Sequence, residues 1–211
     1  MGRCGRDRLR PRRVRLGLLG GTFNPPHIAH LVCAAEALDQ LGLHRVELLP
    51  VHTPPHKEAE GDPGVDCRLE LCRLAVAEDG RLGVSPAEAE IPGRSYTVDT
   101  LRRLHAHRPE DELTFIVGGD MAQSLSTWRD PEGILELAEI GVAGRDGVDR
   151  DAILDRLSGL RGVPDRIRFF HMPRIDISSS MIRRRAAEGR SIRHLVPDPV
   201  AAAIERAGLY R

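Results

Sequence analysis

Short runs rich in Leu, Ile and Val alternate, from residue 14 onwards, with stretches in which apolar residues recur every three or four positions. The first pattern is typical of strands buried in a sheet, and the second is typical of amphipathic helices. Their alternation indicates repeated βα units, which build parallel sheets covered by helices. The predicted strands are 14–19, 45–49, 82–84, 113–117, 140–143 and 167–170, and the predicted helices are 28–41, 67–78, 97–107, 133–138, 151–157, 179–187 and 199–207. We therefore expect a single α/β domain with a Rossmann-like, doubly wound parallel sheet and C-terminal helices.

Two stretches interrupt this alternation. Residues 1–13 contain six arginines and one aspartate without hydrophobic periodicity, so they cannot bury enough apolar surface to fold. We expect a disordered tail ahead of a domain over 14–211, with a nucleic-acid-binding arm or a transit peptide as alternatives. Residues 50–65 are rich in Pro, Gly, Glu and Asp, and an irregular loop of this length is usually functional or mobile. We expect this loop to lie over a binding site.

The composition argues against several classes of partner. Thirty-one basic and 31 acidic residues cancel, so no global field draws the chain to nucleic acid or to an anionic membrane. No apolar run is long enough to span a bilayer, and no signal peptide is visible. The four cysteines form no Cys-x-x-Cys pair, and we expect reduced, mostly buried thiols in the cytoplasm. Neither nucleic acid nor a membrane is expected as a partner, while a homo-oligomer remains open.

The turn after the first predicted strand is the strongest candidate for a binding site. In an open α/β sheet, ligands bind beyond the carboxyl ends of the strands. Gly20 and Gly21 would allow a ligand to approach the backbone closely, and the helix that follows Pro26 would present unpaired N–H groups with a partial positive charge. The turn is therefore expected to bind an anion.

Two histidines accompany this turn. His27 and His30 are three residues apart, hence on one face of a first helical turn, where both imidazoles can donate hydrogen bonds to one phosphate chain. A zinc site and a capping or packing role are alternatives, although no third ligand of obvious spacing is at hand. The Walker A pattern and the Gly-x-Gly-x-x-Gly fingerprint are both absent, which excludes a P-loop NTPase and an ordinary dinucleotide-binding dehydrogenase.

Four segments resemble the nucleotidyltransferase superfamily with the His-x-Gly-His signature, and most closely the bacterial nicotinate-nucleotide adenylyltransferases. They are 20–30, the Pro-Pro-His-Lys of 54–57, 115–128 with Gly-Gly-Asp and Ser-Thr-Trp, and the Ile-Ser-Ser-Ser-Met-Ile-Arg of 177–183. The ending Gly-Leu-Tyr at 208–210 is similar as well. The chain departs from the pattern at Ala29, where the signature has glycine, at Asn24, where Asp is frequent, and at Ser180, where Thr is commoner.

The resemblance implies that the 5′-phosphate of nicotinate mononucleotide attacks the α-phosphorus of ATP and releases pyrophosphate, a step of NAD biosynthesis. The second pKa of such a phosphate is about 6, so the nucleophile needs no general base at neutral pH. The protein has to align two anionic substrates and stabilise charge on the departing pyrophosphate. Mg²⁺ would arrive with the ATP phosphates.

The same resemblance assigns residues to this reaction. His27, His30, Lys57 and Arg183 would bind phosphates, and Lys57 is the only lysine of the chain. The substrate-binding positions would be Gly20, Gly21, Thr22, Phe23, Asn24, Thr97, Gly118, Asp120, Trp128, Ser178 and Ser180.

For the acceptor, the resemblance implies that Trp128 stacks on the nicotinate ring, that Thr97 lines the same pocket and that Asp120 contacts ribose hydroxyls. More ordinary roles stay open: core packing for Trp128, a turn for Asp120, helix capping for Ser178 and Ser180, and a solvated cation for Lys57.

Rival functions differ from this hypothesis in the residues that they need. A sister adenylyltransferase acting on phosphopantetheine would need neither Trp128 nor Ser95-Tyr96-Thr97, and preference for the acid over the amide of the pyridine nucleotide is left undecided. A non-catalytic nucleotide sensor would tolerate loss of His27, His30 or Arg183, and the chain has all three.

Overall fold

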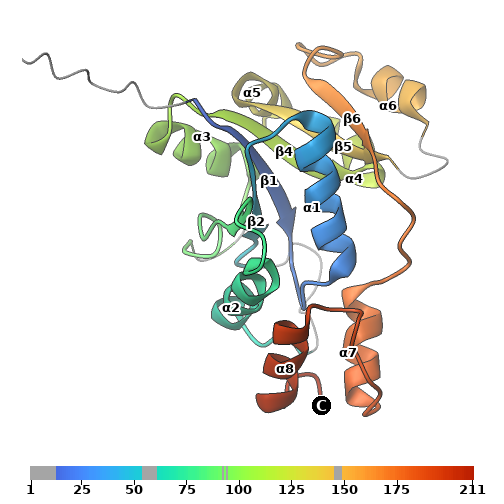
Figure 1. Cartoon of the computed structure of the whole chain (residues 1–211). Coiled ribbons are helices and arrows are strands. Elements are labelled where there is room, and N and C mark those ends of the chain that lie inside the picture. The colour runs from blue at the N-terminus through green and yellow to red at the C-terminus, as the bar shows by residue number, and fades with distance from the viewer. Residues whose placement is uncertain (1–12, 54–60, 92, 94, 145–148) are drawn as a thin grey trace, which may run out of the picture.

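Six parallel strands form the sheet at the centre of the molecule (Figure 1). This computed structural model describes residues 13–53, 61–91, 93, 95–144 and 149–211. The strands are β1 (Arg15–Gly21), β2 (Arg45–Pro50), β3 (Leu82–Val84), β4 (Glu112–Gly118), β5 (Ala138–Gly144) and β6 (Ile167–His171). Their order is β3-β2-β1-β4-β5-β6. The strand order therefore reverses between β1 and β4, and open α/β sheets bind ligands at such a switch point.

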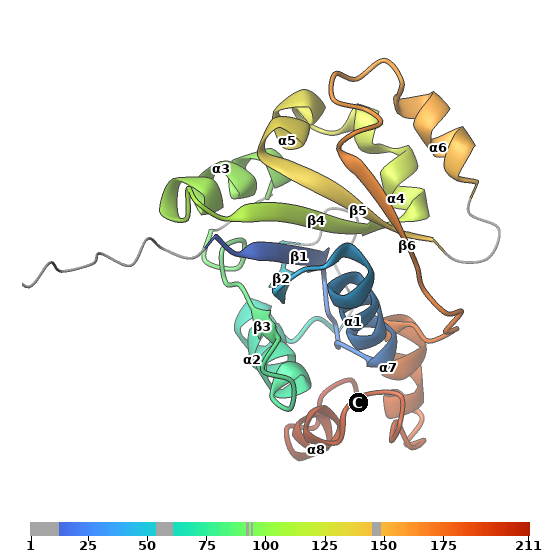
Figure 2. The ribbon, with the colours of Figure 1, turned by 45° about the horizontal axis from the view of Figure 1, so that its top comes forward.

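Helices cover both faces of this sheet (Figure 2). They are α1 (Ile28–Leu41), α2 (Val65–Val76), α3 (Thr97–His107), α4 (Gly119–Gln123), the 3₁₀ helix η1 (Leu125–Thr127), α5 (Pro131–Leu137), α6 (Arg150–Leu157), α7 (Ser179–Ala187) and α8 (Asp198–Arg206). Every predicted strand and helix is present, with bounds that differ by at most two residues. Among the described elements, only α4 and η1 are not predicted by the sequence, because elements this short contain too few positions for a helical repeat. The predicted fold class is confirmed.

Alternation along the strands builds two separate apolar layers. Successive strand side chains point to opposite faces. On one face, Leu16, Leu18 and Phe115 pack against α3, α5 and α6. On the other face, Leu19 and Ile116 pack against α1 and α2. Each layer therefore fixes the helices that start or end beside the switch point.

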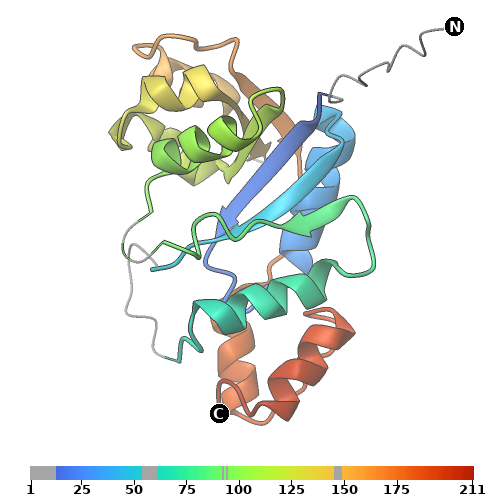
Figure 3. The same ribbon diagram turned by 90° about the vertical axis from the view of Figure 1, so that its left-hand side faces the viewer.

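The last two helices close the carboxyl end of the sheet. Figure 3 shows α7 and α8 beside α2, below the ends of the strands. An apolar cluster joins these three helices through Leu71 and Ala75 of α2, Ile182 of α7, and Val200 and Ile204 of α8. The C-terminal chain is thereby brought next to the turn after β1.

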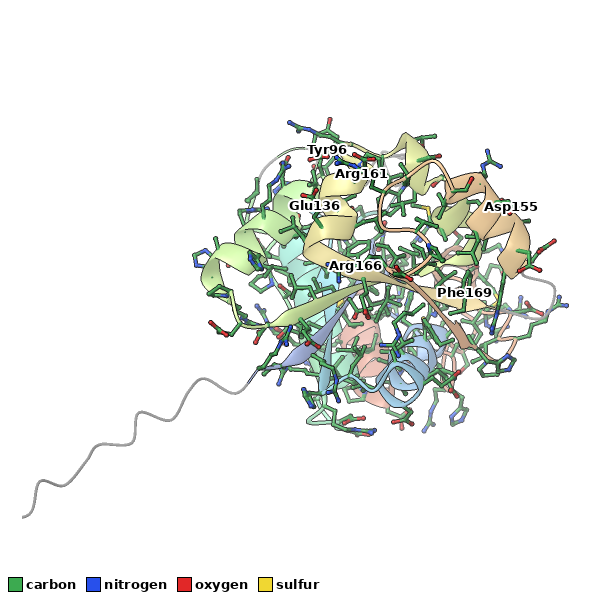
Figure 4. The ribbon with its side chains drawn as sticks, turned by 90° about the horizontal axis from the view of Figure 1, so that it is seen from above. Tyr96, Glu136, Asp155, Arg161, Arg166 and Phe169 are labelled. Atoms are coloured by element: carbon green, nitrogen blue, oxygen red, sulfur yellow. The ribbon has the colours of Figure 1, made fainter. Side chains whose placement is uncertain are left out.

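The opposite end of the sheet is seen in Figure 4. Arg166 donates a hydrogen bond to the carbonyl of Glu136 at 3.0 Å, and the guanidinium of Arg150 lies 5.4 Å from the ring centre of Phe169. These contacts attach α5 and α6 to the edge strand β6. They involve none of the predicted site residues.

Three further expectations concern the chain as a whole. Cys33 and Cys72 are buried as predicted, and burial raises the pKa of the Cys72 thiol, whereas Cys67 is half-buried. The predicted tail lies outside the described residues except for Arg13. No helix in the described ranges is long and apolar enough to cross a membrane.

Candidate active site

The turn after β1 is shaped by two aromatic rings. A Cβ atom at Gly20 would lie 3.0 Å from the ring of Phe115, and one at Gly21 would lie 2.9 Å from the ring of Phe23. Phe23 itself has a left-handed backbone with φ of 50°, and its ring is buried. The glycines thus make room for these rings. That they also allow a ligand to approach the backbone closely stays a prediction. Ala29 packs into the apolar cluster beneath α1, so its methyl fills the interior.

Two of the first backbone N–H groups of α1, and the N–H of the residue before it, already have acceptors within the protein. The N–H of Ile28 donates to the carbonyl of Leu195 at 3.0 Å, and that of His30 donates to the carbonyl of His27 at 2.9 Å. The N–H of His27 donates to Nδ1 of His30 at 3.2 Å. The expectation of free N–H groups is therefore wrong at these three residues. Side chains become the main candidates for binding an anion here.

The two histidines lie together, as predicted. His27 is the residue just before α1 rather than part of its first turn, and its ring stacks on that of His30 with centres 3.7 Å apart. The ring of Phe23 meets His30 edge-on at 4.9 Å. Because Nδ1 of His30 accepts a hydrogen bond, the proton of the neutral ring sits on Nε2. This tautomer has its N–H on Nε2, on the far side of the ring from Nδ1. His30 can therefore accept from the backbone of His27 through Nδ1 and donate to a ligand through Nε2.

Burial keeps both imidazoles uncharged. Desolvation lowers the pKa of His27 to about 4. For His30, desolvation and then the neighbouring His27 lower the pKa to about 3. The free site therefore presents these rings at neutral pH as hydrogen-bond donors without a full positive charge.

The start of α7 is clamped onto the same loop. Arg183 donates from Nη1 to the carbonyl of Asn24 at 2.8 Å and from Nη2 to the hydroxyl of Ser180 at 3.2 Å. Ser179 donates to the carbonyl of Pro25 at 2.8 Å. Ser178 caps the helix by accepting from the N–H of Met181. The structure thus brings Arg183 and Ser180 to the β1–α1 loop (residues 22–27), confirming that these distant segments meet.

The C-terminus reaches this loop as well. The hydroxyl of Tyr210 donates to Oδ1 of Asn24 at 2.7 Å, and burial raises the pKa of Tyr210, so the hydroxyl stays a donor. Asn24 is only 2% exposed. The resemblance includes the Gly-Leu-Tyr ending without implying a role for Tyr210, and it implies none for Ser179. The small-polar run before a predicted helix was the available signal for Ser179, whereas nothing local marked Tyr210.

A second group of predicted residues gathers beyond β4. Trp128 follows η1, its Nε1–H donates to the hydroxyl of Ser124 at 3.0 Å, and its ring meets Phe115 edge-on at 6.1 Å. The indole is half-buried, so one part packs on the core and another part reaches the surface. Gly118 ends β4, and Asp120 lies two residues further on, exposed in the first turn of α4.

The start of α3 is joined to the residues around Trp128. Thr97 is the first residue of α3. Just before it, the ring of Tyr96 carries the guanidinium of Arg129 at 4.7 Å, and Arg129 also donates to Asp99 at 3.1 Å. Thr97 and Trp128, predicted to serve one pocket, therefore belong to segments in contact. We call residues 95–99 and 124–130 the α3–η1 region.

Three buried side-chain atoms of the described residues have no hydrogen-bond partner. They are Nδ2 of Asn24, Nδ1 of His27 and Oγ of Ser95. Buried polar atoms are normally paired, so each of these exceptions calls for an explanation. Two lie in the β1–α1 loop and the third lies in the α3–η1 region. The unpaired atoms thus mark the same two regions that the sequence analysis chose for binding.

Some predicted features of the site are not found among the described residues. Lys57 lies in residues 54–60, the middle of the loop expected to lie over the site, and these fall outside the described residues. Among those described, no group of three or more His, Cys, Asp or Glu side chains could hold a metal ion, which leaves the zinc alternative without a ligand set. A hollow of about 380 Å³ between α2 and α8, partly lined by Leu71 and Leu209, includes none of the predicted site residues.

Comparison with known proteins gives consistent relatives. Residues 18–185 match the family model described as cytidylyltransferase-like. The chain is 43% identical over 212 residues to a probable nicotinate-nucleotide adenylyltransferase of Citrifermentans bemidjiense, covering 93% of this chain and 98% of the relative. It is 41% identical over 198 residues to the protein of the same description from Thermus thermophilus, covering 94% and 100%.

A solved structure shares the fold at low sequence identity. The nicotinic acid mononucleotide adenylyltransferase of Plasmodium falciparum complexed with NaAD matches with a TM-score of 0.75 at 15% identity, over 94% of this chain and 98% of that one. The same parasite enzyme complexed with APC matches with a TM-score of 0.74.

Proposed function

The chain belongs to the cytidylyltransferase-like family and, within it, to the nicotinate-nucleotide adenylyltransferases, and from this premise we propose that it transfers the adenylyl group of ATP to nicotinate mononucleotide. The products are deamido-NAD and pyrophosphate. The oxygen of the 5′-phosphate forms a bond to the α-phosphorus while the bond to the departing pyrophosphate breaks, in line and without a covalent intermediate. This is a step in the biosynthesis of NAD.

One observation carries the proposal beyond family membership. The buried atoms without partners are Nδ2 of Asn24 and Nδ1 of His27 in the β1–α1 loop, and Oγ of Ser95 in the α3–η1 region. A two-substrate transferase needs polar groups at two places, one for each substrate. The β1–α1 loop is the proposed ATP site, and the α3–η1 region is the proposed acceptor site.

At the ATP site, the groups available are donors. His30 presents Nε2–H because its Nδ1 is engaged, Arg183 holds a planar guanidinium beside the carbonyl of Asn24, and Nδ2 of Asn24 has two N–H bonds without an acceptor. Phosphate oxygens accept such bonds, and charge builds up on the pyrophosphate as it leaves. Donors fixed in place stabilise that charge without reorganising.

Neutral histidines suit this task. Two stacked cations would repel each other, whereas two neutral rings can both lie within one small loop. No residue has to remove a proton, because the acceptor phosphate is mostly dianionic at neutral pH. Mg²⁺ enters as part of the ATP substrate, and Lys57 is proposed to add a positive charge near the phosphates.

At the acceptor site, we propose that the half-buried indole of Trp128 stacks on the nicotinate ring, that Thr97 and Ser95 meet the ring's carboxylate, and that Asp120 and Gly118 face the ribose. Trp128 is held by Ser124 and Phe115, so the free face of its ring is fixed before substrate arrives. We place the reaction in the cytoplasm, in keeping with the thiols of Cys67 and Cys72, which form no disulfide.

The test is a substrate panel. Purified protein is incubated with ATP, Mg²⁺ and, in turn, nicotinate mononucleotide, nicotinamide mononucleotide or phosphopantetheine, and pyrophosphate release is followed. We expect turnover of nicotinate mononucleotide above both others. Turnover of phosphopantetheine alone would assign the chain to the sister reaction, and no turnover of either pyridine nucleotide would overturn the proposal.

A further inference from the structure

Arg68 of α2 is a charged side chain with no exposed surface. Its guanidinium makes four hydrogen bonds. Nε donates to Oδ1 of Asp62 at 3.1 Å, Nη1 donates to the carbonyls of Thr22 at 2.8 Å and Val51 at 2.9 Å, and Nη2 donates to the carbonyl of His52 at 2.9 Å. Every nitrogen of the guanidinium therefore has an acceptor.

The position of Arg68 on its helix is one that an apolar residue would normally occupy. Leu71 and Cys72 lie three and four positions further along, and Ala75 follows at seven, so all four share the buried face of α2. Burial of a charge costs several kcal/mol unless hydrogen bonds compensate it. An apolar side chain could fill this space, so packing alone does not account for an arginine here.

The carbonyls that Arg68 binds belong to two separate loops. Thr22 begins the β1–α1 loop, whereas Val51 and His52 follow β2 and lead directly into residues 54–60, which include Lys57. One guanidinium thus sets the distance and direction between the two stretches of backbone.

The contact with Thr22 also orients the next peptide group. In a trans peptide, the C=O and the following N–H point in opposite directions. Since the carbonyl of Thr22 points to Arg68, the N–H of Phe23 points away from it, and Phe23 holds a left-handed φ of 50°. Loss of the guanidinium would free this peptide to rotate.

We propose that Arg68 is a positioning residue that holds the proposed phosphate-binding β1–α1 loop against the backbone of residues 51 and 52, directly after β2, without touching substrate. The inference rests on the proposed ATP site. Arg68 stabilises a conformation of the β1–α1 loop in which the donors around Asn24 and His30 fit a triphosphate chain. ATP binding should depend on Arg68 more than acceptor binding does, because the contacts recorded for the α3–η1 region do not involve it.

The substitution Arg68→Lys separates positioning from charge. Lysine keeps the positive charge but lacks the planar fork that reaches four acceptors in fixed directions. Arg168 on β6 provides the matched control, because its guanidinium also binds a backbone carbonyl but none in the β1–α1 loop. Its Nη1 donates to the carbonyl of Leu41 at 3.1 Å and to the carboxylate of Glu139 at 3.4 Å. We expect Arg68→Lys to weaken the binding of Mg-ATP at least 10-fold by calorimetry and Arg168→Lys to leave it unchanged.

Melting temperatures are measured alongside. A merely structural role predicts that Arg68→Lys lowers the melting temperature but leaves the Kd of Mg-ATP within twofold, and that result would overturn the proposal. If Arg68→Lys does not fold, Asp62→Asn decides, because it removes the negative charge beside Nε and leaves the three carbonyl acceptors of Arg68 unchanged. We expect about threefold weaker ATP binding there, and unchanged binding would count against the inference.

Failure of the proposed function would look different. If the wild-type protein turned over neither pyridine nucleotide but bound Mg-ATP, the reaction would be wrong while the calorimetric comparison still tested Arg68. If the wild-type protein did not bind Mg-ATP, both the proposed reaction and the proposed role of Arg68 would be wrong. In an active enzyme, Arg68→Lys is expected to raise the KM for ATP at least 10-fold and that for the acceptor less than twofold.

Discussion

The β1–α1 loop and the α3–η1 region are held in place by different kinds of contact. In the first, hydrogen bonds from Arg68, Arg183 and Tyr210 reach acceptors of the loop from three different helices or chain ends. In the second, Arg129 lies on Tyr96 and pairs with Asp99, and all three side chains are at the surface or half-buried.

The difference is physical as well as geometric. A buried donor removed from its partner leaves an unpaired acceptor, which costs about 1–3 kcal/mol. An exposed ion pair contributes about 0–1 kcal/mol and weakens as salt is added. The proposed ATP site is therefore built for a fixed geometry, whereas the contacts of Arg129 that join the two segments of the proposed acceptor site can be rearranged by small energies. Each of the following experiments tests one side of this comparison.

The largest effect is expected at His30. His30→Ala removes an N–H donor from the proposed pyrophosphate site, and we expect the rate to fall at least about 100-fold while the circular dichroism spectrum is unchanged. His105→Ala, an exposed histidine on α3, is the matched control and should retain full activity. Near-normal kinetics of His30→Ala would remove His30 from the catalytic set.

The buried histidines should also make stability depend on pH. The folded pKa of His30 is about 3 and the unfolded value is 6.5, so the unfolded state binds more protons between these values. Stability from this group is fully present above pH 6.5 and is lost as the pH falls. By pH 5 the loss should be about 2 kcal/mol relative to His30→Gln. The free energy of unfolding of the wild-type protein and of His30→Gln is measured in urea as a function of pH. If the two free energies changed with pH in the same way, His30 would not be buried in its neutral form.

Tyr210→Phe tests the contact between the C-terminus and Asn24. Without the hydroxyl, Oδ1 of Asn24 loses its donor at a buried position. We expect the KM for ATP to rise about 10-fold, which corresponds to about 1.4 kcal/mol. Tyr96→Phe makes the same chemical change at the only other tyrosine and should leave the KM for ATP unaltered. Equal behaviour of the two variants would disprove a specific role for Tyr210.

A smaller effect is expected at the exposed ion pair. Asp99→Asn weakens the attachment of Arg129, and we expect the KM for the acceptor to rise two- to fivefold at low salt, with the KM for ATP unchanged. The effect should shrink when sodium chloride is added. Arg81→Ala, which breaks an exposed pair with Asp79 elsewhere on the surface, is the control. An effect that persists at high salt would contradict the comparison.

Removal of residues 1–13 should have the smallest effect. Of this stretch the structure describes Arg13 alone, which forms an exposed pair with Glu112 at 2.8 Å. We expect unchanged kcat and KM values, measured with the substrate panel. A loss of catalysis would mean that the arginine-rich segment contributes to the site.

The sequence predicted the elements well because their signals are local. Short apolar runs define each strand, and the helical periodicity that places Leu71 and Cys72 inside α2 also placed the helix bounds within two residues. The resemblance likewise named Arg183, Ser180, Thr97 and Trp128, and the structure brings the first two to the β1–α1 loop. Their roles in binding stay predictions.

Other properties of the site depend on where distant residues meet. The helical periodicity of α2 could have drawn attention to Arg68 as a charge on an apolar face, but it could not show that the acceptors would be carbonyls. Nor could the sequence show that Leu195 and His30 accept from the N–H groups of Ile28 and His27, which makes side chains the main candidates for binding an anion.

The sequence by itself determined the βα alternation, the position of the turn after β1 and the set of residues able to carry charge to it. Tertiary structure decided which hydrogen-bonding groups at this turn are already paired within the protein and which remain available to a ligand. Arg68, Arg183 and Tyr210 bind Thr22 and Asn24 across 46, 159 and 186 residues of chain, respectively. Hydrogen bonds need an acceptor at about 3 Å in a defined direction. No local pattern encodes that requirement, because it is met only when the folded sheet brings these segments to one edge.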